Sequence, residues 1–145
     1  MKKKILLWAF VVLWMAVIFI FSHQPATDSS KLSSGIVGKI VDIIETVAPN
    51  IDIDQGSLSH IIRKCAHFGE YLVLGLLVLN GLICSNISIP KTTLLALLIC
   101  VLYAVSDEIH QLFIPGRSGQ VSDVLLDSIG ALVGILLMSA IKKRR

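Results

Sequence analysis

The chain has 145 residues, of which 54% are hydrophobic and 16% are charged, and its mean hydropathy is +0.81. This composition is too apolar for an ordinary soluble domain of this size, and it indicates one small membrane domain over residues 1–145. The net charge is +3, but basic residues cluster at both termini beside apolar segments, a pattern that favours anionic lipid headgroups over nucleic acid as a partner.

Four apolar runs are long enough to cross a hydrocarbon core of about 30 Å as helices. They cover residues 5–21, 65–84, 92–109 and 122–141. The first run is longer than the core of a signal peptide and has no Ala-x-Ala site after it, so we expect an uncleaved span. The sequence therefore predicts an all-α membrane protein built as a four-transmembrane-helix bundle.

Lysine and arginine positions predict the orientation, because short cytoplasmic segments are enriched in these residues. Eight of the thirteen basic residues lie on the side of the two termini: Lys2, Lys3, Lys4, Lys91, Lys142, Lys143, Arg144 and Arg145. We therefore expect a multi-pass protein of the cell membrane with both termini cytoplasmic.

The external loop over residues 22–64 contains apolar residues at helical spacing, namely Leu32, Ile36, Ile40, Ile43 and Val47. This spacing predicts an amphipathic helix that either lies on the outer membrane surface or packs on the ends of the spans. Further along the loop, Ser57 is the expected N-cap of the helix that continues into the second span.

Polar residues gather at one end of the spans. Because consecutive spans run in opposite directions, the start of the second, the end of the third and the start of the fourth lie at the same membrane surface. Ionisable groups inside spans are costly to bury and indicate a functional site. The predicted pocket residues are Arg63, His67, Glu70, Asp107, Glu108, His110, Gln111, Arg117, Asp123 and Asp127.

Two glycine-containing motifs shape this end of the chain. Gly130-x-x-x-Gly134 permits a close approach of the last helix to a neighbour. Ile114-Pro115-Gly116-Arg117 predicts a type II turn with positive φ at Gly116, which would project Arg117 over the mouth of the bundle. The guanidinium would then bind an anionic ligand or form a structural clamp to Asp123 or Asp107.

The histidines leave the chemistry open. His67 and His110 beside four carboxylates permit a divalent metal or an acid–base site, although a histidine near the end of a span is more often a hydrogen-bonded packing residue. No Ser, Cys or metal-ligand spacing matches a recognised catalytic signature, so catalytic residues and cofactor stay unassigned.

These residues resemble the VanZ-like family of small bacterial membrane proteins. The resemblance rests on the segments Phe21–Pro25, Arg63–Tyr71 with Gly75, and Asp107–Arg117, and continues through Asp123, Val124, Asp127 and Gly130. It implies a multi-pass protein of the cell membrane, and the name-giving member is associated with resistance to teicoplanin-type glycopeptides. The resemblance supplies no established reaction.

The leading hypothesis for function is an extracytoplasmic polar pocket that binds lipid headgroups, cell-wall lipid intermediates or lipoglycopeptide antibiotics. The alternative is an intramembrane hydrolase or transferase, metal-dependent or using His and carboxylate groups, that acts on a lipid phosphate or ester. A third possibility is a polar clamp that stabilises the four helices, with partner binding through the loop helix. The expected partners are membrane lipids, and an oligomer is compatible with the sequence.

Overall fold

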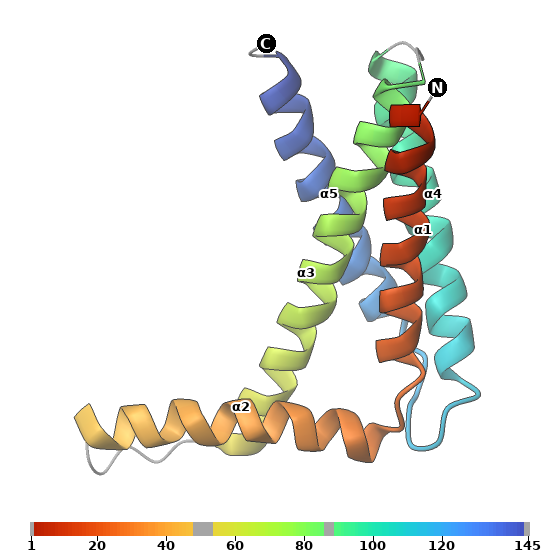
Figure 1. The fold of residues 1–145 in the computed structure, drawn as a ribbon. Helices are drawn as coiled ribbons and strands as arrows, with labels where there is room; N and C mark the ends of the chain where they lie inside the picture. The colour runs from red at the N-terminus through yellow and green to blue at the C-terminus, as the bar shows by residue number, and fades with distance from the viewer. Residues whose placement is uncertain (1, 48–53, 86–88, 144–145) are drawn as a thin grey trace.

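The computed structural model describes residues 2–47, 54–85 and 89–143. Within these ranges the chain forms five helices, which Figure 1 shows in order. They are α1 (Lys2–Ser22), α2 (Ala26–Val47), α3 (Gln55–Ile83), α4 (Ile89–Gln111) and α5 (Val121–Lys143). All but α2 are long and apolar enough to cross a membrane, so the predicted four-span helical fold is confirmed. The third span begins at Lys91, inside α4.

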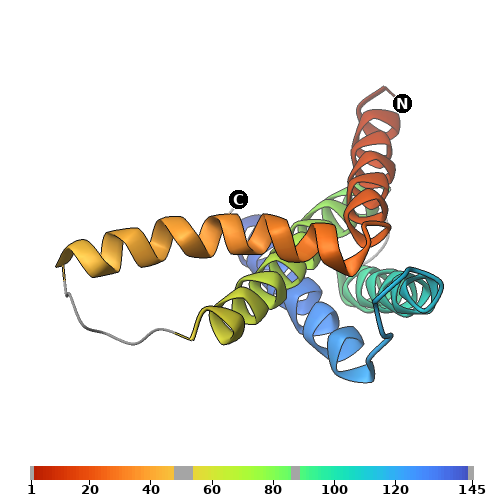
Figure 2. The ribbon, with the colours of Figure 1, turned by 90° about the horizontal axis from the view of Figure 1, so that it is seen from below.

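The spans alternate in direction, and α2 lies across one end of the bundle. In Figure 1, α1 begins and α5 ends at the same end, while α2, the start of α3 and the loop between α4 and α5 lie at the other. Figure 2 views this second end, where α2 extends past the bundle and away from α1 and α4. The side of the membrane on which each end lies stays a prediction.

The α2 helix has one covered face and one uncovered apolar face. Its Ser33 and Val37 side chains are buried, and the Ser33 hydroxyl lies 2.6 Å from the Ser59 hydroxyl of α3. Leu32 and Ile43 remain 57% and 65% exposed. The predicted amphipathic helix is therefore confirmed; it packs on the end of α3 and also presents apolar side chains suited to a membrane surface.

The prediction that Ser57 caps α3 is wrong, because Asp54 holds this position. The Asp54 carboxylate accepts hydrogen bonds from the backbone N–H groups of Gly56 and Ser57 and from the Ser57 hydroxyl at 2.6 Å. The hydroxyl of Ser57, followed by these N–H groups, lowers the pKa of Asp54. A carboxylate offers two acceptor oxygens, so it can serve the helix start and the serine together.

The closest approach in the bundle is between α3 and α5. A Cβ atom on Gly130 would lie 2.5 Å from the Phe68 carbonyl oxygen, and one on Gly134 would collide with the Leu72 backbone. The close contact predicted from the glycine spacing is thus confirmed. It places the acidic face of α5 directly against α3.

Replacing Gly134 with Ala should lower the stability of the purified protein, since the added methyl group must push two backbones apart. Overpacking of this kind costs about 1 to 3 kcal/mol. Gly69→Ala is the matched control, because a Cβ there meets no atom within 4 Å. Thermal unfolding in detergent tests the pair, and equal melting temperatures for both variants would contradict the packing argument.

Candidate functional site

A polar pocket of about 150 Å³ lies at the α2 end of the bundle. Segments far apart in the sequence form its wall: the start of α2, the first four turns of α3, the end of α4, the following loop and the start of α5. The lining residues are Ala26, His60, Arg63, Lys64, His67, Gln111, Gly116, Arg117, Ser118, Gln120 and Asp123. Antiparallel threading therefore brings Arg63, His67, Gln111, Arg117 and Asp123 of the predicted site to one cavity.

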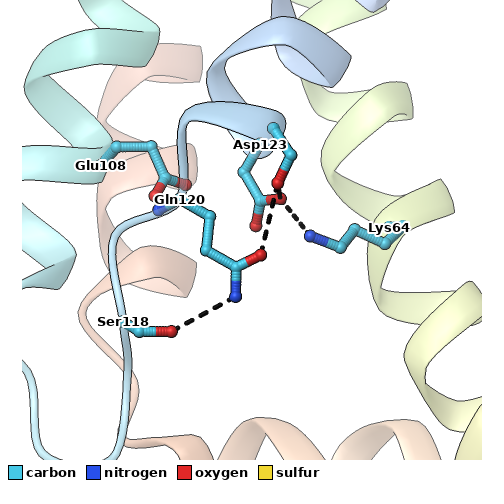
Figure 3. A network of polar contacts seen from close by, with 6 residues as sticks. Lys64, Glu108, Ser118, Gln120 and Asp123 are labelled. Carbon is cyan, nitrogen blue, oxygen red and sulfur yellow. Dashed lines mark hydrogen bonds and ion pairs between the residues drawn. The ribbon is translucent and has the colours of Figure 1, made fainter.

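An ion pair joins the two sides of the pocket. Lys64 of α3 pairs with Asp123 of α5, and both side chains are largely buried. Figure 3 shows this pair beside Gln120, whose side chain donates to the Ser118 hydroxyl. The one carboxylate in the pocket wall is thus already matched by a lysine.

The predicted turn is present, and it directs Arg117 to an unexpected partner. Gly116 has φ of 75°, and the Arg117 N–H donates to the Ile114 carbonyl at 3.1 Å. The Arg117 guanidinium donates to the Gln24 and Phe21 carbonyls, at 3.0 and 3.4 Å. The predicted clamp to Asp123 or Asp107 is therefore wrong, because the guanidinium instead binds one carbonyl in the last turn of α1 and one that follows the helix.

Arg63 differs from Arg117 in having no internal partner. No hydrogen bond or ion pair joins its guanidinium to any residue in the described ranges. Its charge nevertheless acts on Arg117: burial, followed by the like charge of Arg63, lowers the pKa of Arg117. Two positively charged guanidinium groups therefore face one small cavity.

Behind the pocket lies a layer of acidic groups on α4. Asp107 accepts hydrogen bonds from the Ser22 hydroxyl at 2.7 Å and from the Gln111 amide at 3.4 Å. Glu108 accepts one from the Gln120 backbone N–H at 2.8 Å. Both carboxyl groups are buried, and the second oxygen of each has no partner among the described residues.

Asp127 is the most buried acidic residue of the predicted site. Its side chain is 0% exposed, and neither oxygen has a hydrogen-bond partner in the part of the chain that the structure describes. The hydroxyl of Tyr71, also 0% exposed, likewise has none there. Glu70 is half-buried, and its backbone carbonyl accepts from the Trp14 indole at 2.8 Å.

His110 does not line the pocket. Its ring lies against Phe19, with centroids 4.5 Å apart, and its Nε2 is 3.1 Å from Nδ1 of His23. The two histidines of the predicted site thus face different surroundings. Across residues 2–47, 54–85 and 89–143, no three His, Cys, Asp or Glu side chains are arranged to hold a metal ion.

Several contributing residues were absent from the sequence-based set. Ser22 and His23 belong to the Phe21–Pro25 segment that carries the family resemblance, which was their available signal. Lys64 belongs to the Arg63–Tyr71 segment of the same resemblance, which was its available signal. His60 and Gln120 had no signal in the sequence, because loop and helix-end geometry brings them to the pocket.

The fold and this polar end define a small multi-pass helical membrane protein. A comparison with protein-family models matches residues 7–142 to the VanZ/LLP1 family. The chain therefore belongs to this family, and the predicted resemblance is confirmed. Searches of curated proteins and of solved structures found no match.

Arg117→Ala should lower stability more than Arg63→Ala does, because only the first removes hydrogen bonds to the end of α1 among the described contacts. Hydrogen bonds to charged groups contribute about 1.5 to 3 kcal/mol, and partial exposure should reduce the loss to about 1 kcal/mol. Chemical or thermal unfolding in detergent compares the two variants. An equal loss for both would show that Arg117 has no special structural role.

Proposed function

We propose that the pocket binds the anionic headgroup of a membrane amphiphile, such as an anionic phospholipid or a phosphate-bearing cell-wall lipid intermediate. The observation that carries the proposal is the guanidinium of Arg63, which lies beside Arg117 in the pocket wall and has no partner among the described residues. On this proposal the protein is a binding module whose ligand enters from the surrounding lipid.

The charge balance of the pocket supports an anion. Lys64 and Asp123 offset each other, which leaves the guanidinium groups of Arg63 and Arg117 without a facing carboxylate in the pocket wall. Like charges in a partly desolvated cavity repel, and a bound anion would turn this repulsion into two favourable contacts. A planar guanidinium also suits the oxygens of a phosphate or carboxylate.

The size of the pocket favours a headgroup over a whole antibiotic molecule. Its volume of about 150 Å³ is below the range of about 300 to 1,000 Å³ that is usual for sites of drug-sized ligands. A phosphate group with part of its ester fits such a space, whereas the body of a lipoglycopeptide would have to stay outside. Drug contact, if it occurs in this chain, would involve one small group of the antibiotic.

The position of the pocket also suits a lipid. Ala26, the first residue of α2, lines the pocket, and this helix carries the exposed apolar residues Leu32, Ile36 and Ile43. A helix with such a face lies at the boundary between headgroups and acyl chains. The pocket would then open at headgroup depth, on the extracytoplasmic side if the predicted orientation holds.

Arg63→Gln should weaken the binding of phosphatidylglycerol by about tenfold, because a charged hydrogen-bond donor is lost. Binding is measured for purified protein in detergent by native mass spectrometry, with phosphatidylcholine as the zwitterionic comparison. Lys31→Gln is the matched control, since Lys31 is an exposed α2 cation that pairs with Asp28 outside the pocket. Equal affinity of the wild-type protein for both lipids, or an unchanged affinity in Arg63→Gln, would contradict the proposal.

A further inference from the structure

We infer that anion binding in the pocket is coupled to a proton held by the carboxyl group of Asp127. This inference rests on the proposed function and adds a second ligand, the proton, at a separate position inside the bundle. It starts from a feature that anion binding alone leaves unexplained, namely a fully buried acid that has no hydrogen-bond partner within the described structure.

The fold fixes Asp127 in this position. Gly130, three residues further along α5, lies against the Phe68 carbonyl oxygen, so this stretch of α5 cannot move away from α3 without losing a close backbone contact. The Asp127 side chain is 0% exposed as a result. A carboxylate in such a site, without a hydrogen-bond donor, is far more costly than the neutral acid.

The charged groups that act most strongly on Asp127 are acidic, and they come from three helices. Glu70 acts on it from α3, Asp107 and Glu108 from α4, and Asp123 from α5 itself. A negative charge on Asp127 would therefore be repelled from three sides. A proton removes this repulsion and supplies an O–H donor to a layer in which Asp107 and Glu108 each have an unpartnered acceptor within the described structure.

A second buried group belongs to the same layer. The Tyr71 hydroxyl of α3 is fully buried, has no partner in the described ranges, and interacts electrostatically with Asp107, Asp127 and Glu70. A hydroxyl can both donate and accept, so it can adapt to either protonation state of a neighbouring acid. The layer therefore contains more hydrogen-bond acceptors than donors, together with a hydroxyl that can serve as either. A proton on one of its carboxyl groups would supply a donor.

The pocket and the proton site are one helical turn apart. Asp123 lines the pocket and Asp127 follows on the same face of α5, at an axial rise of about 6 Å. An anion in the pocket therefore favours the neutral form of Asp127, and the neutral form favours the anion. This coupling is reciprocal, and coupling of this kind commonly changes affinity by about 5- to 150-fold.

The test compares phosphatidylglycerol binding by wild-type protein and Asp127→Asn between about pH 6 and pH 9, with the lipid phosphodiester a constant monoanion in this range. Asparagine is nearly isosteric and mimics the protonated acid. As the pH rises, both affinities are followed, and the factor by which the wild-type affinity falls should be at least about five times the factor for the variant. A misfolded variant would bind weakly, whereas the expected result is tighter binding than wild type at high pH.

His60 and His67 line the pocket in both wild type and variant, so the difference between the two curves is the readout. Asp28→Asn on α2 is the matched control and should follow the wild-type curve. Parallel curves for wild type and Asp127→Asn would overturn the coupling and leave the proposed function intact. Absence of phosphatidylglycerol preference at every pH would instead refute the proposed function.

A second measurement needs no variant. Adding phosphatidylglycerol to wild-type protein in lightly buffered detergent at about pH 8 should cause proton uptake, which a pH-sensitive dye detects. Phosphatidylcholine at the same concentration should cause none. Binding of phosphatidylglycerol without proton uptake would overturn the inference.

Discussion

The backbone contact between α3 and α5 is the constraint on which the rest of the structure depends. Lipid tails are as apolar as leucine, so helices in a membrane associate through close packing and polar contacts rather than through hydrophobic burial. Gly130 and Gly134 allow this packing by bringing α5 onto the carbonyl groups of α3. The same contact sets Lys64 opposite Asp123 and encloses Asp127. The pocket and the buried acid are thus two consequences of one helix pair.

The remaining spans are joined to this pair by polar contacts at their edges. The Trp14 indole of α1 donates to the Glu70 carbonyl of α3, and the Tyr103 hydroxyl of α4 donates to the Met15 carbonyl of α1 at 2.6 Å. Arg117 then closes the α2 end by binding the Phe21 carbonyl of α1 and the Gln24 carbonyl that follows this helix. The pocket wall therefore depends on loops and helix ends. Of its two arginines, Arg117 has a structural role, while Arg63 has no partner in the described ranges.

Hydropathy predicted the four spans because a helix in lipid must satisfy its backbone internally and needs a fixed apolar length. The Pro115-Gly116 turn was predictable because glycine alone tolerates its positive φ easily. The partner of Arg117 was not predictable, because every residue type has a backbone carbonyl and the sequence does not mark which of them is free to accept a hydrogen bond. Arg63 and His67 are four residues apart and so share one side of α3, whereas Lys64 reaches the pocket from beside them. The N-cap of α3 was mispredicted because Asp54 and Ser57 lie three residues apart and both residue types can cap a helix.

Two groups without partners in the described structure, Arg63 and Asp127, argue against the hypothesis that the polar end serves only as a clamp that stabilises the four helices. Polar contacts between membrane helices contribute about 0.6 kcal/mol on average. Lys64 with Asp123, and Ser22 with Asp107, fit that purpose. Arg63 and Asp127 do not, because a group without a partner in the described structure gives the bundle no bond and imposes a cost of desolvation. A cation at the rim and an acid behind it, both without such partners, are instead the arrangement that a small anion and a proton would complete.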